Sequence, residues 1–213
     1  MRYTFHDGVH AVRCRGRIIV LDERTNRYLG LTPRQEAALL GDDAASQDPG
    51  ILAPLLRRGL LLQAPDSTLD LSPAHPPPLS SLLEDGRPLD LEIRDLAGCV
   101  RAFRAGQRVI VHGRLSNFLG QLRQASPTGS ALGAVEADAR RFLAARLWMP
   151  WVPVCLLDSL ALLFFLGAKG HTAQLVIGVS TAPFEAHCWV ERDAVVLNET
   201  LLRARSFTPI LVA

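Results

Sequence analysis

The stretch that decides the fold runs from Pro153 to Gly167 and reads PVCLLDSLALLFFLG. A proline at the start, a glycine at the end and apolar side chains on every face predict a buried helix. The run is too short to cross a membrane, which takes roughly 20 apolar residues, and it carries Asp158. Cys155 lies in the first turn, where the helix dipole favours a thiolate. The same position also suits an inert core cysteine, so both interpretations stay open here.

The other half of a candidate site lies in the run from Pro183 to Glu191, which reads PFEAHCWVE. An apolar strand rarely holds an imidazole, yet His187 lies in the middle of this one. A thiol at a helix start and a histidine on a later strand are typical of a cysteine nucleophile and its base. A structural histidine is the alternative. Alternation along the strand places Cys188 on the opposite face, as a core residue.

A base of this kind needs a third group that holds the imidazole. If the hairpin after this strand has a three-residue loop, Glu191 faces Val195. Counting back along both strands then places Glu199 opposite His187. A two-residue loop would place a neighbour of Glu199 there instead. These neighbours are Asn198 and Thr200. The sequence therefore predicts a catalytic set of Cys155, His187 and Glu199.

The remaining thiols and imidazoles show no spacing that would hold a metal ion or a cofactor. They include Cys14, Cys99, His112 and His171. The four cysteines of the chain form no CxxC pair. We therefore expect Cys14 and Cys99 to be structural, all four thiols to be reduced, and the protein to be cytoplasmic and to use neither metal nor cofactor.

The composition is that of an ordinary globular protein. Of 213 residues, 48% are hydrophobic and 21% are charged, which leaves no room for extensive disorder. The formal net charge of +2 is too small to favour nucleic acid as a partner. The first residues lack the apolar core of a signal peptide. Function therefore has to be argued from sites.

The N-terminal part predicts a winged-helix-like domain. Three β-rich runs separated by polar turns favour a three-stranded antiparallel sheet. They are residues 9–14, 17–21 and 27–31. The capping box Thr32-Pro33-Arg34-Gln35 begins a helix that runs through Leu40. Asp48-Pro49 begins another, which Gly59 ends. Residues 60–63 then predict a wing strand. Neither helix is basic enough to indicate DNA binding.

Residues 64–79 hold five of the fourteen prolines and predict a stiff linker. The expected parts are an N-terminal domain (1–66), a linker (67–79) and a C-terminal domain (80–213). In the last part the helical period predicts a helix around Leu96, and further elements follow. These are helices over 109–122 and 135–147, and strands over 173–179, 186–191 and 194–197. The chain is therefore predicted to be α+β, with a helical bundle and a small antiparallel sheet around the Cys155 helix.

Four blocks of the C-terminal domain carry a family resemblance. They read Pro153-x-Cys155-Leu156-x-x-Ser159-Leu160-Ala161-Leu162, Gln174-Leu175-Val176-Ile177-Gly178-Val179, Pro183-Phe184-x-Ala186-His187-x-Trp189-Val190-Glu191 and Asn198-Glu199. In order and spacing they resemble the lasso peptide leader peptidases, which are transglutaminase-like cysteine proteases. The resemblance covers about residues 150–200. The order of elements is also similar to that of papain-like and transglutaminase-like hydrolases.

The N-terminal domain resembles the precursor-peptide recognition domain of such pathways, similar to the peptide chaperone of pyrroloquinoline quinone synthesis. The resemblance rests on the order of elements and on Tyr28-Leu29-Gly30-Leu31-Thr32-Pro33. It implies that a leader peptide adds as a strand to the edge of the small sheet, at Tyr28, Leu29, Gly30 and Leu31, and packs against a helix.

The resemblance implies a cysteine peptidase that removes the leader from a lasso peptide precursor. It also implies a separate partner, an ATP-using lactam synthetase similar to asparagine synthetase. Three rivals remain: a catalytically silent peptide-recognition scaffold, an acyl or amide transferase that uses the same residues, and a winged-helix DNA regulator.

Three positions depart from the family pattern. Asp158 stands where arginine is frequent, and a negative charge one turn from Cys155 would work against a thiolate. Glu199 replaces the usual aspartate, so its carboxylate must be set back by one methylene. Cys188 stands where alanine is common, and we expect little consequence from it.

Overall fold

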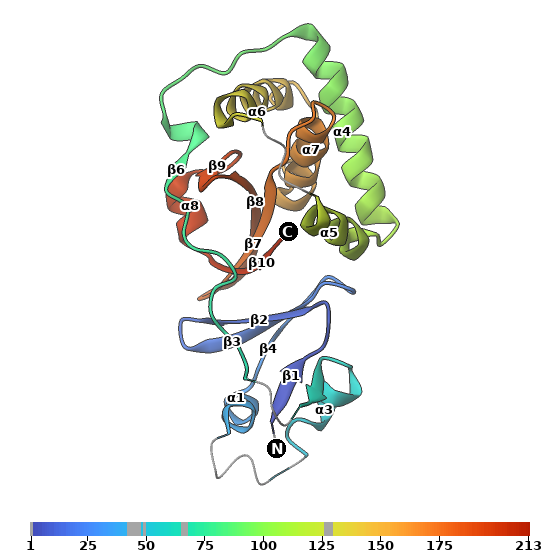
Figure 1. Cartoon of the computed structure of the whole chain (residues 1–213), viewed down its shortest axis with the longest axis vertical. Coiled ribbons are helices and arrows are strands. Elements are labelled where there is room, and N and C mark those ends of the chain that lie inside the picture. Colours follow the sequence, from blue (N-terminus) through green and yellow to red (C-terminus); the bar gives the residue numbers. More distant parts are fainter. Residues whose placement is uncertain (1, 42–47, 49, 65–67, 126–129) are drawn as a thin grey trace.

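The structure is a computed structural model, and it describes residues 2–41, 48, 50–64, 68–125 and 130–213. It is a mixed α+β protein, as predicted. Figure 1 shows a small N-terminal sheet with short helices at one end of the molecule. A larger unit of long helices beside a second sheet makes up the other end. Among the described residues, no helix is long and apolar enough to span a membrane.

The predicted three-stranded sheet is confirmed. Strands β2, β3 and β4 pair antiparallel in that order. Their bounds are Val9–Cys14, Arg17–Asp22 and Arg27–Gly30. Arg15 (φ 46°) and Gly16 (φ 81°) form the first turn. Two consecutive residues with positive φ match the twist of a tight hairpin, so the predicted turn is confirmed too.

The first helix begins at the predicted capping box. The Thr32 side chain accepts the backbone N–H of Gln35, and the Gln35 side chain accepts the backbone N–H of Thr32. This satisfies two N–H groups that a helix start leaves without partners. Helix α1 then runs over Pro33–Leu40 and ends at Gly41, which has a φ of 83°.

The predicted start of the second helix at Asp48 is wrong. Asp48 forms a turn instead, because its carboxylate accepts the backbone N–H of Gly50 at 2.8 Å. The helix, α3, covers only Ala53–Arg57. Gly59 follows it with a φ of 64°, as a helix-ending glycine does. Pro49 lies outside the described residues.

The predicted wing strand forms, but with an unexpected partner. Strand β5 (Leu61–Gln63) pairs antiparallel with β1 (Tyr3–Phe5) and forms a separate two-stranded sheet. The predicted domain boundary at Asp66 and Ser67 lies outside the described residues, so the division into domains stays a prediction.

The C-terminal unit is built on the helices α4 to α7. Their bounds are Ile93–Val111, Leu115–Gln124, Leu132–Arg146 and Cys155–Gly167. The helix predicted to begin at Val109 is wrong at its start, because α4 continues through Val111. The chain then turns at Gly113, whose φ of 62° suits a glycine. The buried helix at Cys155 is confirmed, and seven of its side chains are buried in the core.

The second sheet has the strand order β10-β7-β8-β9-β6. In chain order, β6 to β10 cover Ser80–Ser81, Gln174–Thr181, Phe184–Arg192, Val195–Val196 and Thr208–Val212. The three predicted strands of this region are confirmed as β7, β8 and β9. The sequence did not indicate β10, the helix α8 (Leu201–Arg205), or the parallel pairing of β6 with β9.

Both faces of β3, the central strand of the N-terminal sheet, are buried, which explains its apolar run. Ile18 and Val20 pack into a core with α1 and α3. Ile19 and Leu21 face the other way and belong to the main core of the C-terminal unit. In addition, the Cys14 thiol donates a hydrogen bond to the carbonyl of a β7 residue at 3.5 Å. The small sheet is therefore packed between its own helices and the larger unit.

The proline-rich segment before β6 lies against the C-terminal sheet, as Figure 1 shows. The backbone N–H of Ala74 donates to the Pro209 carbonyl at 2.9 Å. The His75 ring lies 3.0 Å from the carboxylate of Glu191, which is fully buried and also accepts the indole N–H of Trp189. This segment is therefore fastened to the sheet at both backbone and side chain.

Gly178 offers a test of the packing of this sheet. An added Cβ would lie 2.7 Å from Cβ of Phe207 and 2.9 Å from the ring of Trp189. We expect Gly178→Ala to lower the free energy of unfolding by about 1–3 kcal/mol, since overpacking forces neighbours to move. Gly120→Ala is the matched control: no atom lies within 4 Å, and alanine in a helix adds up to about 1 kcal/mol. Urea unfolding measures both. Equal effects of the two changes would contradict the packing described.

Candidate active site

Cys155 lies in the first turn of α7, as predicted, but the helix begins at Cys155 itself and not at Pro153. Val154 is the residue before it and has extended backbone angles. The first hydrogen bond of the helix runs from the Asp158 N–H to the Val154 carbonyl at 2.9 Å. The N–H groups of Cys155, Leu156 and Leu157 therefore come before the bonded ladder and are candidate oxyanion donors. The Cys155 side chain is half-buried, whereas the other three cysteines are buried.

His187 lies on β8, opposite Gly178 of β7. Its ring packs beside two aromatic side chains, with ring centroids 6.1 Å from Trp189 and 5.2 Å from Phe207. Gly178, which has no side chain, leaves the space that the Trp189 ring and Cβ of Phe207 occupy. The imidazole is thus held by packing as well as by hydrogen bonds, and its side chain is only 10% exposed.

Glu199 holds the imidazole. The Nε2 atom of His187 lies 2.8 Å from Oε2 of Glu199. The other carboxylate oxygen accepts the backbone N–H of Thr200 at 2.8 Å, and the Glu199 carbonyl accepts the Ser81 hydroxyl at 2.6 Å. Ser81 belongs to β6, so the segment before the helical bundle helps to place this carboxylate. Because Nε2 faces Glu199, Nδ1 is the ring nitrogen left for the Cys155 sulfur.

The three-residue loop that led to Glu199 is nevertheless wrong, and the two-residue alternative is the one present. Glu191 faces Val196 rather than Val195, so the loop has two residues, Asp193 and Ala194, both with positive φ. Counting back from this register points to Thr200 and not to Glu199. The ladder ends at β9, however, and the chain then turns into α8. This departure from the strand brings Glu199 to the histidine.

Asn198 does not hold the imidazole, although its side-chain oxygen could accept an imidazole N–H. Its side-chain oxygen accepts the backbone N–H of Val190 at 2.8 Å, in place of a further strand residue. Its amide nitrogen donates to the Ser159 hydroxyl at 3.1 Å, and that hydroxyl donates to the Cys188 carbonyl at 3.3 Å. Ser159 is one turn below Cys155 on α7. This chain of bonds therefore fastens the nucleophile helix to the strand of the histidine.

The charges at the site favour a thiolate and an imidazolium. The pKa of the Cys155 thiol is lowered to about 4, by hydrogen bonds from the Cys188 thiol and from His187, and burial only partly opposes them. Burial lowers the pKa of His187, but its hydrogen bonds to Cys155 and Glu199 outweigh this and raise it. At neutral pH the proton therefore rests on the imidazole.

Cys188 affects the nucleophile Cys155 more than the sequence indicates. It is a core residue, as predicted, and only 5% exposed. Hydrogen bonds from its thiol and from its backbone N–H are among the causes that lower the pKa of the Cys155 thiol. The pKa of the Cys188 thiol is raised, first by that hydrogen bond and then by burial, so it remains protonated as a donor. A buried neighbour of the histidine thus acts on the nucleophile.

Asp158 does not oppose the thiolate as the sequence suggests. Its carboxylate forms an ion pair with the Arg146 guanidinium and accepts the backbone N–H of Val154 at 2.7 Å. Arg146 also donates to the Trp151 carbonyl at 3.1 Å and lies over the ring of Phe103. The negative charge is therefore balanced by a fixed cation. Asp158 instead fastens the chain just before the nucleophile.

The four predicted leader-binding residues lie on or just after the edge strand β4. The Leu31 N–H donates inward to the Ile18 carbonyl, and Val20 pairs with Leu29. Since bonded pairs alternate along an antiparallel ladder, the backbone groups of Tyr28 and Gly30 point outward. Among the described residues, no backbone partner reaches them. The Leu31 side chain is fully buried and Leu29 pairs with Val20, so the open backbone groups of this edge are those of Tyr28 and Gly30.

Tyr28 connects this edge to the thiols. Its ring contacts Phe184 at the start of β8, with centroids 5.8 Å apart. Burial first, and then the charges of Cys188 and Cys155, raise the pKa of the Tyr28 hydroxyl. The phenol therefore lies within electrostatic reach of the nucleophile. The open edge of the small sheet is therefore in contact with the strand that carries the catalytic base.

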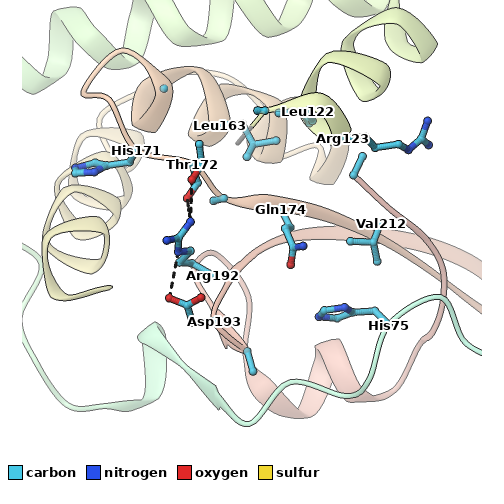
Figure 2. A pocket seen from close by; sticks show the side chains of 15 residues that line it. His75, Leu122, Arg123, Leu163, His171, Thr172, Gln174, Arg192, Asp193 and Val212 are labelled. Atoms are coloured by element: carbon cyan, nitrogen blue, oxygen red, sulfur yellow. Dashed lines mark hydrogen bonds and ion pairs between the residues drawn. The ribbon is translucent and has the colours of Figure 1, made fainter. Parts of the chain in front are cut away.

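A large cavity lies away from these residues. It has a volume of about 750 Å³ and is lined by the far end of α7, by α5 and by the turn after β8. Figure 2 shows Arg192 in its wall, bonded to Thr172 and to Asp193. The other charged groups there also have partners, such as Arg123 with Glu23. Because these charged groups are paired with one another or with neighbouring residues, we assign the chemistry to Cys155 and not to this cavity. No group of three potential metal ligands occurs among the described residues.

Comparison with known protein families matches residues 96–212 to the transglutaminase-like superfamily. The match covers more than half of the chain and includes Cys155, His187 and Glu199. The chain belongs to the transglutaminase-like superfamily. No match was found among the curated proteins or the solved structures. The superfamily includes cysteine proteases and transglutaminases, so an enzyme that works through a thiol is in keeping with the site.

The thiolate can be tested by alkylation. We expect the rate of modification of Cys155 by iodoacetamide to rise with pH through about 4, because only the thiolate reacts. In His187→Ala the inflection should move to higher pH, since a cation and a donor are removed. The rate is followed by mass spectrometry of the Cys155 peptide, with Cys155→Ala as background. An inflection that stays near 8 to 9 in the native chain, the ordinary range of a thiol, would contradict the ion pair.

Proposed function

We propose that the protein is a cysteine peptidase that binds the leader of a lasso peptide precursor and hydrolyses the bond between leader and core. The observation that carries the proposal is the open edge of β4, whose Tyr28 packs against Phe184 at the start of the strand that carries His187. A docking edge for an extended peptide and a nucleophile on one chain suit an enzyme whose substrate is itself a peptide. The resemblance of the sequence blocks supplies the substrate class.

The hollows beside β4 support strand addition. One, of about 340 Å³, lies on the helix side and is lined by Leu29, Arg58 and Leu60 among others. Another, of about 260 Å³, lies on the side of the C-terminal unit, between Tyr28 and Phe184. An added strand points alternate side chains to opposite faces. A leader bound at this edge would place successive side chains in the two hollows.

The chemistry proceeds from the resting ion pair. The Cys155 thiolate attacks the carbonyl carbon of the last leader residue, and the oxyanion faces the N–H groups at the start of α7. The His187 imidazolium gives its proton to the leaving amine of the core. The leader is then a thioester on Cys155. His187, now neutral and held by Glu199, takes a proton from water, which hydrolyses the thioester and restores the thiolate.

The proposal includes the partner that such a pathway needs. A freed core amine is the nucleophile for lactam formation, which requires activation of a carboxylate by ATP. A lactam synthetase similar to asparagine synthetase is therefore the proposed next enzyme.

The nucleophile and the product are tested together. Purified chain incubated with its precursor peptide should release a core with a free N-terminus, and Cys155→Ala should lower kcat/KM by at least about 10³-fold. Glu199→Gln should lower kcat by about 10- to 100-fold with KM little changed, through loss of a charge-assisted bond to the base. Mass spectrometry reads the products. Cleavage that survives Cys155→Ala would make the chain a scaffold, and an added group on the product would make it a transferase.

The docking edge is tested at Gly30, because its backbone N–H points outward and a proline at this position would remove that N–H. We expect Gly30→Pro to raise KM for the full precursor about 10-fold or more, the loss expected from one or two backbone hydrogen bonds. Gly30→Ala keeps the N–H, and its Cβ would meet only Ile19 at 3.6 Å, so it should bind as the native chain does. A short peptide that spans the cut but lacks the leader should be processed equally by both variants. Equal KM values for the precursor would place the docking site elsewhere.

A further inference from the structure

We infer that Cys155 and Cys188 form a reversible intramolecular disulfide when a hydroperoxide oxidises the nucleophile. Cys188 would then be the resolving thiol of a modification site. The inference concerns the chemistry of the two sulfurs and does not depend on the proposed peptidase activity. It gives a second role to the thiol that, in the resting site, lowers the pKa of Cys155.

The geometry of the α7–β8 junction brings the two residues together. Cys155 begins α7, and Cys188 lies on β8, on the strand face against which α7 packs. Ser159, one turn below Cys155, donates to the Cys188 carbonyl at 3.3 Å and fixes the helix at that residue. Cys188 is buried in the main core cluster, as are Cys14 and Cys99, and Cys155 packs against that cluster from the start of α7. A hydrogen bond from the Cys188 side chain is also the largest cause of the lowered pKa of the Cys155 thiol.

The other two cysteines have different surroundings. Cys99 is fully buried in α4, and burial raises the pKa of its thiol to about 11. Cys14 lies on β2, where its sulfur accepts the hydroxyl of Thr208 and its thiol donates to Val179. Neither takes part in the hydrogen bonds at Cys155. Only Cys188 is placed to meet an oxidised Cys155.

The reaction balances in two steps. The Cys155 thiolate attacks a hydroperoxide, the O–O bond breaks, and Cys155 becomes a sulfenic acid while the other oxygen leaves as hydroxide or alkoxide. The Cys188 sulfur then attacks the sulfenic sulfur; its thiol proton and the displaced hydroxide leave as water, and an S–S bond forms. Each peroxide accepts two electrons from two thiols. An external dithiol reverses the reaction by exchange.

The two steps occur in a fixed order because of charge. In the resting site the thiolate of Cys155 raises the pKa of Cys188, so Cys188 stays a thiol and does not compete for the oxidant. Once Cys155 is a neutral sulfenic acid, that negative charge is gone and Cys188 ionises more readily. Cys155 is also the only half-buried thiol of the four. The oxidant therefore meets Cys155 first.

The test treats the full chain with one equivalent of hydrogen peroxide, blocks free thiols with N-ethylmaleimide and maps the peptides. We expect a linked peptide containing Cys155 and Cys188, and return of Cys155 labelling by iodoacetamide after dithiothreitol. This readout needs no variant. A native chain that carries sulfinic acid at Cys155, or a link from Cys155 to Cys14 or Cys99, would overturn the inference.

Two variants test the role of Cys188 directly. In Cys188→Ala we expect Cys155 to proceed to sulfinic acid, with labelling lost for good after dithiothreitol. Cys99→Ala is the matched control, the same substitution at another buried cysteine, and should recover as the native chain does. Circular dichroism verifies that each variant folds. Equal recovery of Cys188→Ala and Cys99→Ala would show that Cys188 protects nothing and would overturn the assignment.

Discussion

The junction between α7 and β8 is the constraint on which the site depends. A thiolate and an imidazolium stabilise each other only at short range, so the helix start and the strand must be held in one register. Apolar packing alone is tolerant of small shifts. The bonds from Asn198 to Ser159 and from Ser159 to the Cys188 carbonyl are directional, and they lie in the core one turn from the nucleophile. An unmade bond there would leave a buried polar group without a partner, which costs about 1–3 kcal/mol.

The charges around the thiolate are balanced pair by pair. Asp158 is matched with Arg146, and Glu199 with His187, while Arg203 lies 3.6 Å from the Glu199 carboxylate. Each carboxylate near the nucleophile therefore has its own cation. This arrangement explains how a chain with an acidic residue in the first turn of its nucleophile helix still has a thiol pKa of about 4.

The sequence predicted the parts whose signal is local. The apolar run of α7, the capping box at Thr32 and the alternation around His187 each depend on neighbours in the chain, and each is present. Glu199 was reached through a register that the structure contradicts, because a loop shorter by one residue moves every partner. The carboxylate meets the imidazole only because the ladder ends at Val196. No local pattern indicates that ending.

Other features could not be predicted from the sequence because they arise from contacts between residues that are far apart in the chain. The run Ile18–Leu21 is apolar without alternation because its two faces meet different cores, and periodicity cannot say which second core exists. Cys188 looks like any core residue in the sequence. Its influence on Cys155 appears only when helix and strand are packed together. The same holds for Ser81, which is remote in sequence and bonds the Glu199 carbonyl.

Because β3 packs into the cores of both units, the small sheet is held against the C-terminal unit, and under the proposed function this links docking to catalysis. Tyr28 is on the outermost strand, and its side chain faces the C-terminal unit rather than the N-terminal helices. A peptide strand added to β4 would therefore form bonds with the backbone of the residue whose ring lies against Phe184. Phe184 in turn begins the strand that carries His187. Docking and catalysis are then joined by a rigid sheet instead of a flexible linker. The number of peptide residues between the docked strand and the thiol sets where the chain is cut.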